Sequence, residues 1–184
     1  MLSSIARLAK RLNWARHGWS TARDREFHNA LFASEPYDPF NASYPGYLTI
    51  RRFADLAVQS IRVGDAVIDL GCGPGEITCE LARRRPDSHF VGVDHSSEAV
   101  ARAERLAANL GLTNVHFELN DLEQYQPRQH VGLVTMFDAF HHLLDPGGFV
   151  RRVGPSCDRF FLIEPAGNWL GQWQKTLDVD WIAE

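Results

Sequence analysis

The chain has 184 residues, enough for one domain with a hydrophobic core, and 45% of them are hydrophobic and 23% charged. The net charge of −4 excludes an overall electrostatic attraction to nucleic acid, and no apolar run is long enough for a membrane-spanning helix. Cys72, Cys79 and Cys157 lack metal-ligand spacing, and their odd number favours reduced thiols in a cytoplasmic protein.

Residues 1–45 are expected to form an N-terminal segment outside the main domain. Apolar residues recur at helical spacing from Leu2 to Leu12 with arginine and lysine between them, and no acidic residue precedes Asp24. This basic stretch has three interpretations: a surface helix packed on the domain, which we favour, a helix at a membrane surface, or a mitochondrial presequence. Residues 34–46 contain three prolines and predict an irregular loop.

The main domain is expected to begin with a helix at residues 46–61 and a strand at residues 66–70. Apolar residues in the helix are spaced to form one continuous face, and Gly64 follows as a helix stop. The short apolar run around Ile68 is typical of a buried parallel strand.

A glycine-rich turn follows this strand. Gly71, Gly73 and Gly75 stand at alternating positions just before a helical pattern, so strand, turn and helix N-terminus form a cradle that a ligand can approach closely. Glu76 occupies the sixth position, where the dinucleotide fingerprint has glycine, and no Lys-Ser/Thr pair follows as in a P-loop. Asp69 and Glu76 therefore favour a ligand that carries positive charge and hydroxyl groups.

At this turn the chain resembles the Rossmann-like (class I) S-adenosyl-L-methionine (SAM)-dependent methyltransferases of the small-molecule type. Their first motif is an acidic residue followed by Gly-x-Gly-x-Gly, which Asp69 and the three glycines match. The resemblance covers residues 46–165 and implies a doubly wound, mainly parallel α/β sheet with SAM as cofactor. It also implies that this motif, with Cys72, holds the methionine end of SAM, and that residues 1–45 form a lid-like segment.

Residues 76–85 predict the next helix, and residues 89–94 a second strand that ends at Asp94. Asp94 follows the glycine turn by about 20 residues, the spacing of a ribose-binding acid at the end of a second strand. One carboxylate can accept hydrogen bonds from both hydroxyls of a ribose, so an acid here selects a ribosyl ligand. The resemblance likewise places the ribose at Asp94, with His95 beside it. Another helix is expected at residues 97–110.

Two further strands, at residues 115–119 and 131–137, lead into more candidate cofactor-binding residues. The resemblance implies that Asp121, with Leu122, binds the adenine after the third strand. It also makes Phe137, at the end of the fourth strand, part of the cofactor site.

His141 and His142 follow the fourth predicted strand, at the edge where open α/β sheets bind ligands. The family often carries a His-His or Leu-His pair here. Either histidine is a candidate general base, because imidazole exchanges its proton near neutral pH, and we favour His142. The chain lacks the Asn/Asp-Pro-Pro-aromatic tetrapeptide with which the family methylates exocyclic or amide nitrogens, which argues against adenine, cytosine or glutamine as the target.

A fifth strand is expected at residues 160–164, followed by a C-terminal tail, residues 166–184, with one predicted helix. The family normally continues with another helix and a pair of antiparallel strands, and we expect these last antiparallel strands to be lacking. The sequence therefore predicts five parallel strands in the order 3-2-1-4-5. The fifth strand would be a free edge, open to self-association unless the tail, a second chain or additional C-terminal residues cover it.

These patterns together predict a SAM-dependent methyltransferase that acts on oxygen, carbon or nitrogen of a small molecule. The alternative is a non-catalytic module that binds SAM or S-adenosylhomocysteine (SAH) within a larger protein or assembly, which the missing strands favour. A nicotinamide-dependent oxidoreductase also stays open, although Glu76 opposes it. A nucleic-acid methyltransferase is a weaker alternative, which the basic N-terminal stretch keeps open for a tRNA partner. We expect a cytoplasmic protein without a metal, a nucleic-acid partner or stable membrane insertion.

Overall fold

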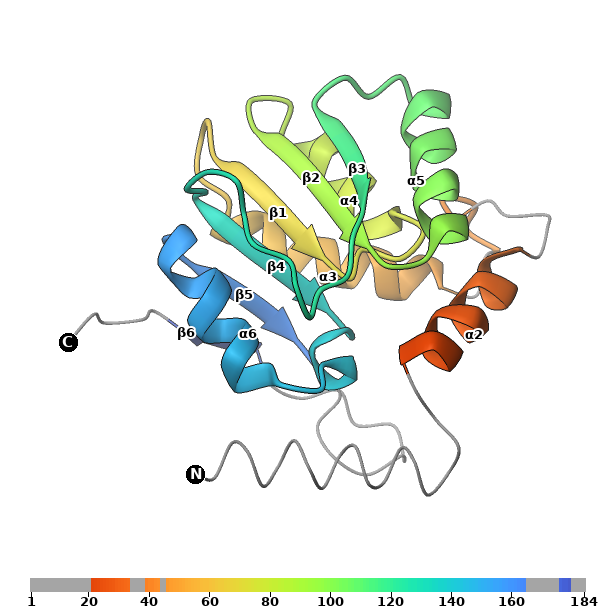
Figure 1. Ribbon diagram of the computed structural model, residues 1–184. Coiled ribbons are helices and arrows are strands. Elements are labelled where there is room, and N and C mark those ends of the chain that lie inside the picture. The colour runs from red at the N-terminus through yellow and green to blue at the C-terminus, as the bar shows by residue number, and fades with distance from the viewer. Residues whose placement is uncertain (1–20, 34–38, 44–45, 165–175, 180–184) are drawn as a thin grey trace.

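The protein forms an α/β sheet whose strands run in the order β3-β2-β1-β4-β5-β6 (Figure 1). The structure, a computed structural model, describes residues 21–33, 39–43, 46–164 and 176–179. The strands are β1 (Ala66–Leu70), β2 (His89–Asp94), β3 (Val115–Leu119), β4 (Leu133–Phe137), β5 (Phe160–Ile163) and β6 (Thr176–Val179). The first five strands are parallel to one another, so the predicted mainly parallel, doubly wound α/β fold and the order of these five strands are confirmed.

Strand β1 lies between β2 and β4, at the point where the strand order reverses. Asp69 of β1 is opposite Gly92 of β2 and Thr135 of β4. Ligands of open α/β sheets bind outside the carboxyl ends of the strands at such a reversal. The sheet therefore presents the ends of β1, β2 and β4 together as one binding edge.

The C-terminal tail differs from the sequence-based prediction. β6 runs antiparallel to β5, with Phe160 opposite Val179 and Ile163 opposite Thr176. The expectation that the last antiparallel strands are lacking is therefore wrong for one strand. The fifth strand is covered by the tail, which is one of the three coverings expected from the sequence. Residues 176–179 form a strand where helical spacing predicted a helix, because ladder hydrogen bonds to an open edge outweigh a weak local preference. The rest of that predicted helix lies outside the described residues.

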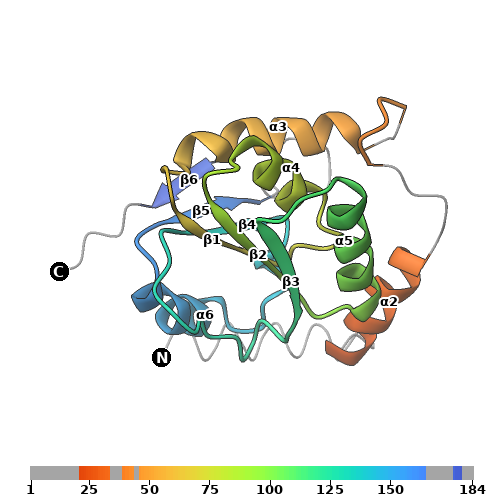
Figure 2. The ribbon, with the colours of Figure 1, turned by 90° about the horizontal axis from the view of Figure 1, so that it is seen from above.

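Helices cover both faces of the sheet (Figure 2). They are α2 (Thr21–Ala33), α3 (Tyr47–Ala57), α4 (Glu76–Arg84), α5 (Ser97–Asn109) and α6 (Pro146–Val153), with 3-10 turns η1 (Val58–Ser60), η2 (Phe140–His142) and η3 (Gly154–Ser156). α3 and α4 lie on one face and α6 on the other, while α5 packs against α4 and β3. The three helices predicted at residues 46–61, 76–85 and 97–110 are confirmed.

The core has a separate apolar cluster on each face of the sheet. Val67 packs with α3 and α4 on one side, and its neighbour Ile68 packs with α6 on the other. Successive side chains of a strand point to opposite faces, so an apolar run is needed only where both faces are covered. This double burial holds β1 rigidly and fixes the turn that follows it.

Helix α2 packs on α5 and lies beyond the carboxyl ends of the strands (Figure 1). It belongs to the N-terminal segment, whose basic part, residues 1–20, lies outside the described residues. The division of the chain at residues 45 and 165 stays a prediction. None of the helices in the described part of the chain has the length and apolar character that a membrane span needs.

Candidate active site

A cavity of about 310 Å³ opens at the carboxyl ends of β1, β2 and β4 and is bounded on its other side by α2. A pocket of this size suits a small ligand. Ten of the twelve residues that the sequence predicts for the site line it: Asp69, Gly71, Cys72, Gly73, Asp94, His95, Asp121, Leu122, Phe137 and His142. Gly75 and His141 are not among the lining residues.

Gly71 and Gly75 have no room for a side chain. Their φ angles are positive, 74° and 79°. A Cβ at Gly71 would lie 2.4 Å from the Cβ of Ala139, and a Cβ at Gly75 would lie 2.6 Å from that of Ala103. The N–H of Gly71 donates to the carbonyl of Val93, at 2.8 Å. These two glycines therefore let the turn pass close to η2 and α5, which is a packing role.

Gly73 lines the cavity and is held by Asp94. Its φ is 53°, and among the described residues a Cβ there would meet only Phe32 of α2 within 4 Å, at 3.8 Å. The N–H of Gly73 donates to Asp94 Oδ2 at 2.9 Å, and the N–H of Ser96 donates to Asp94 Oδ1 at 2.8 Å. A carboxylate has more acceptor sites than these two bonds use. Asp94 can therefore position the glycine turn and still accept hydrogen bonds from a ligand.

Asp69 braces the turn from below. Its Oδ1 accepts a hydrogen bond from Thr135 Oγ1 of β4 at 2.9 Å, and its Oδ2 accepts one from Thr78 Oγ1 of α4. Burial raises the pKa of this carboxyl group to about 6, because the two threonine hydrogen bonds only partly offset the loss of solvent and the nearby Asp94 and Glu76 charges add to it. Asp69 thus ties β1, β4 and α4 together beneath the cavity.

Cys72 is not equipped to act as a nucleophile. It lines the cavity between Gly71 and Gly73. Burial and the neighbouring Asp94 and Asp69 charges raise the pKa of its thiol well above the ordinary value. A reactive cysteine needs the opposite shift, toward the thiolate. Its contribution to the site is therefore shape.

Asp121 and Leu122 follow β3 at the far end of the same wall. Asp121 Oδ1 accepts a hydrogen bond from the N–H of Glu123 at 3.0 Å, which fixes the turn. Asp121 Oδ2 lies 4.0 Å from Arg25 of α2. Leu122 packs near Gly71, since a Cβ on that glycine would lie 3.6 Å from its Cδ1. We call Asp69, Gly71, Gly73, Asp94 and Asp121 the loop wall of the cavity.

The two histidines after β4 lie on the 3-10 turn η2 and have different surroundings. Glu164 holds this turn, because its Oε1 accepts from the N–H groups of Ala139 and Phe140 at 3.0 and 2.6 Å. His141 Nδ1 lies 2.8 Å from Glu164 Oε2, outside the cavity lining. His142 lines the cavity. Of the two histidines, His142 is therefore the one in position to contact a ligand in the cavity.

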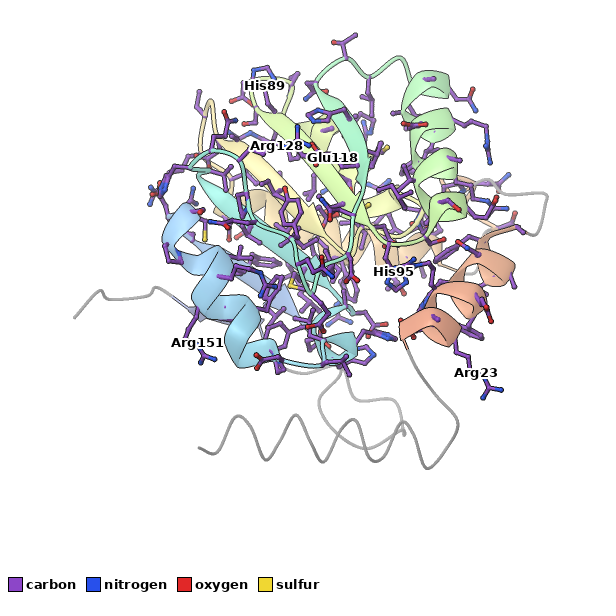
Figure 3. All side chains as sticks on the ribbon, viewed as in Figure 1. Arg23, His89, His95, Glu118, Arg128 and Arg151 are labelled. Atoms are coloured by element: carbon purple, nitrogen blue, oxygen red, sulfur yellow. The ribbon has the colours of Figure 1, made fainter. Side chains whose placement is uncertain are left out.

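Facing the loop wall, three histidines surround one buried aspartate. Asp24 of α2 is 2% exposed, and its carboxylate lies 3.4 Å from His142 Nδ1, 3.7 Å from His28 Nδ1 and 3.8 Å from His95 Nε2. Figure 3 shows His95 between the sheet and α2, whereas Arg23 of the same helix points outward. We call Asp24, His28, His95 and His142 the histidine wall.

In this wall, charge and burial shift the pKa values of the side chains in opposite directions. Burial by itself raises the pKa of Asp24, but the hydrogen bond and positive charge of His142, followed by His28 and His95, outweigh it, and the net pKa is lowered. For His95, burial lowers the pKa more than the carboxylates of Asp94 and Asp24 raise it. The wall therefore combines an ionised carboxylate with an imidazole that stays neutral.

Sequence reasoning missed the residues that α2 contributes to this wall. The pattern predicts a basic helix up to residue 25 and a loop from residue 34, and it assigns nothing to the residues between. Helix α2 is largely polar, and Phe27 and Leu31 are both 52% exposed, so it lacks the apolar stripe that reveals most helices. The one local sign was Asp24 and His28 at the i, i+4 spacing that brings side chains together on a helix.

Comparison with known proteins assigns the family. The family model for a methyltransferase domain matches residues 61–155, just over half of the 184-residue chain. The chain belongs to the methyltransferase domain family. The matched residues of this methyltransferase domain begin at Ile61, directly after η1, and end within η3, so they contain the loop wall, His95 and His142, whereas helix α2 lies outside them.

Several relatives share this domain. Trans-aconitate 2-methyltransferase of Yersinia pestis is 40% identical over 90 residues, 49% of this chain and 33% of that enzyme. The tRNA (guanine-N(7)-)-methyltransferase of Rubrobacter xylanophilus is 36% identical over 80 residues, 44% of this chain and 35% of that enzyme. The chain thus spans about a third of the length of these curated relatives.

Solved structures share the fold at lower sequence identity. Coclaurine N-methyltransferase bound to N-methylheliamine and SAH matches with a TM-score of 0.61 and 18% identity, over 89% of this chain and 57% of that one. The DhpI–SAM–HEP complex matches with a TM-score of 0.60 and 19% identity, over 78% of this chain and 65% of that one. The Rossmann-like methyltransferase fold predicted from the sequence is therefore confirmed.

Proposed function

We propose that this domain binds SAM and transfers its methyl group to a small-molecule acceptor. The observation that carries the proposal is the cavity at the ends of β1, β2 and β4, with the glycine turn and Asp94 on one side and His142 on the other. The family assignment and the relatives support methyl transfer as the reaction class.

The donor set of the loop wall fits SAM. Asp69, Glu76, Asp94 and Asp121 line the cavity, and acidic side chains suit a cationic ligand that carries hydroxyl and amino donors. Gly73 leaves room on its side of the cavity, because Phe32 is the one residue in the described part of the chain that would lie within 4 Å of a Cβ there. When bound, SAM supplies a methyl group on a sulfonium, which is a good leaving group.

Each part of the loop wall has one role in the proposal. The backbone of the turn holds the methionine end, Asp94 accepts hydrogen bonds from the ribose hydroxyls, and Asp121 accepts from the adenine amino group beside Leu122. Because the reaction is an in-line displacement, the protein contributes mainly alignment. His142 is the general base for an acceptor whose nucleophile carries a proton at neutral pH.

The acceptor is a small molecule in this proposal. The cavity is closed on one side by α2, and the net charge of −4 gives no general attraction to a polyphosphate chain. The similarity to a tRNA methyltransferase makes RNA the second candidate acceptor. A cytoplasmic location is part of the proposal, in keeping with three cysteines that form no disulfide.

Calorimetric titration of the full chain tests the cofactor. SAM and SAH should bind in the micromolar range, about 8 kcal/mol, and NADH should not bind. Asp94→Ala should weaken SAM and SAH alike, because a ribose contact does not sense the methyl group. Asp158→Ala is the matched control, since Asp158 is an exposed aspartate just before β5, at the amino ends of the strands and away from the cavity. Binding of NADH without SAM would refute the proposal.

Turnover separates the enzyme from a non-catalytic SAM-binding module. The assay supplies labelled SAM with two acceptor sets, a panel of small carboxylates, phenols and amines and a preparation of unmodified tRNA. Label transfer to a small molecule is the expected result. Transfer to tRNA alone would favour the RNA acceptor, and tight SAM binding with no transfer to either set would favour the non-catalytic module.

A further inference from the structure

The histidine wall contains a set of metal-binding groups, of which the methyl-transfer proposal uses only His142. Asp24, His28 and His142 each offer one ligand atom, and these three atoms lie within 4.8 Å of one another. Two ligands bound to one ion at ~2.1 Å lie at most about 4.2 Å apart, so a modest side-chain rotation brings all three into coordination distance. The three ligands come from α2 and η2, more than 110 residues apart in the sequence.

The surroundings of these ligands resemble those of a built metal site. His28 Nδ1 lies 2.8 Å from the carbonyl oxygen of Asp24, so it donates there and leaves Nε2 as the acceptor nitrogen. Histidines that bind metals usually donate their second ring N–H in this way, which fixes the tautomer. His142 is carried by a turn whose two N–H groups Glu164 holds. The tautomer of His28 and the backbone that carries His142 are therefore both fixed before an ion arrives.

The burial of Asp24 also supports a metal site. Its side chain is only 4% exposed, while those of His28 and His142 are 21% and 37% exposed. A buried carboxylate needs cationic or donor groups beside it, and it is a suitable ligand for a divalent ion that two imidazoles bind at the same time. The partial exposure of His142 leaves the ion a route from the cavity.

We propose that Asp24, His28 and His142 bind a divalent transition-metal ion of the zinc or iron(II) class. Imidazole ligands select such ions over magnesium and calcium, which prefer all-oxygen sites. Three protein ligands leave at least one coordination position open, and it faces the cavity that His142 lines. His95, whose Nε2 lies 3.8 Å from Asp24 Oδ2, stands next to the ion as a further polar neighbour.

The ion would select the chemistry of the acceptor, a step that rests on the proposed function. An oxygen atom bound at the open position would give up its proton more readily, because a divalent ion stabilises the resulting oxyanion. The acceptor class is then a small molecule with a hydroxyl or carboxyl oxygen that can coordinate the metal. His142 would hold the ion in such an enzyme, and the proton would pass to a solvent water in the cavity. The oxyanion would then form the bond to the methyl group as the sulfonium–methyl bond breaks, with SAH as the leaving group.

A second group of potential ligands provides an internal control. Asp138, His141 and Glu164 also lie within 4.8 Å of one another. Glu164 is already occupied, since it accepts from two backbone N–H groups and lies 2.8 Å from His141. Asp138 and His141 are both 48% exposed at the side chain. We therefore expect removal of His141 to leave metal binding unchanged.

The test is a titration of the untagged, chelator-treated full chain with Zn²⁺ by calorimetry and with Co²⁺ by visible absorption. We expect one ion per chain and a Co²⁺ spectrum of nitrogen and oxygen coordination. Asp24→Asn, His28→Gln and His142→Gln should each weaken Zn²⁺ binding by ~10²-fold or more. His141→Gln and His130→Gln should retain it within about threefold. His130 is an exposed histidine that pairs with Asp158 at 2.7 Å.

Folding and SAM binding are checked on the same samples. Circular dichroism establishes that each variant is folded, and His142→Gln decides the question if a substitution at the buried Asp24 unfolds the chain. A wild-type chain that binds no Zn²⁺, or one whose binding survives loss of both His28 and His142, would overturn the metal site. SAM binding measured in parallel keeps this outcome separate from failure of the proposed function.

Discussion

The loop wall and the histidine wall face each other across one cavity, but their residues are held in different ways. In the loop wall, Asp94 accepts from the backbone of Gly73 and Ser96, and Asp69 accepts from two threonines. In the histidine wall, Asp24 meets three imidazoles at 3.4 to 3.8 Å, contacts between side chains of three separate segments. Hydrogen bonds from backbone N–H groups and buried threonines fix the loop wall, whereas the packing of α2 brings the histidine wall together.

In the function that we propose, this difference separates cofactor binding by the loop wall from acceptor chemistry at the histidine wall. A wall built from backbone and buried bonds suits a ligand that is always the same. The histidine wall takes Asp24 and His28 from the peripheral helix α2, where residues can change without disturbing the sheet, which suits an acceptor that differs between relatives. Substitutions in the two walls should therefore change different measurements.

The largest expected effect is on the stability of the loop wall. Gly71→Ala should destabilise the fold by roughly 3 kcal/mol, because φ is positive and the new Cβ would lie 2.4 Å from that of Ala139. Gly64→Ala is the matched control, with a φ of 79° and nothing within 4 Å of a new Cβ, and should cost only about 1 kcal/mol. Urea unfolding measures both. Equal losses would show that Ala139 does not constrain the turn.

In the histidine wall, His142→Ala should reduce turnover by ~10²-fold or more and leave SAM affinity nearly unchanged. His141→Ala should act mainly on stability, because His141 contacts Glu164 and lies outside the cavity lining. Steady-state kinetics and calorimetry on the same preparations measure the two effects. A His142→Ala enzyme with normal turnover on its acceptor would remove His142 from the reaction as base and as metal ligand.

The pH dependence of stability should reveal the raised pKa of Asp69. Its pKa in the folded state, about 6, lies above the ordinary value of 3.8, so between pH 4 and 6 the folded state binds more protons than the unfolded chain. This contribution to stability therefore falls as pH rises through that window, by on the order of 2 kcal/mol. Asp69→Asn removes the titrating group.

Urea unfolding at pH 4 and pH 7 measures this change. The difference in free energy of unfolding between Asp69→Asn and wild type should shift in favour of the variant as pH rises. A difference that stays constant with pH would show that Asp69 ionises normally within the fold.

The smallest effect on SAM binding is expected from the ion pair between α2 and Asp121 of the loop wall. Arg25 of α2 lies 4.0 Å from Asp121, and both side chains are partly exposed. Exposed ion pairs contribute at most about 1 kcal/mol, so Arg25→Ala should weaken SAM binding by less than about threefold. Calorimetry measures the change. A tenfold loss would place α2 in the cofactor site and would remove the distinction between the walls.

The loop wall could be predicted from the sequence because its signals are local. A buried strand, alternating glycines and an acid at the end of the next strand each follow from residues close together in the chain, and the sheet order follows from the fold they imply. The positions of Gly71, Gly73 and Asp94 were therefore predictable, although the packing role of Gly75 depends on Ala103 of α5.

The histidine wall could not be predicted because its contacts are non-local. His142 was identified by its place after β4, but its partner Asp24 lies on a mostly polar helix whose packing on α5 no local pattern shows. Strand β6 was missed for a related reason, since an edge strand is fixed by its neighbour β5 more than by its own residues. The local motifs could be predicted from the sequence, whereas the tertiary contacts could not.

Two buried aspartates on opposite walls offer the most direct test of this separation. Asp94 and Asp24 are 8% and 2% exposed and both line the cavity. SAM affinity is measured by calorimetry for Asp94→Ala and Asp24→Ala, each shown to be folded. We predict that Asp94→Ala weakens SAM binding by ~10²-fold, about 2.7 kcal/mol, and that Asp24→Ala changes it by less than about threefold. Equal losses in the two variants would contradict the assignment of cofactor binding to the loop wall alone.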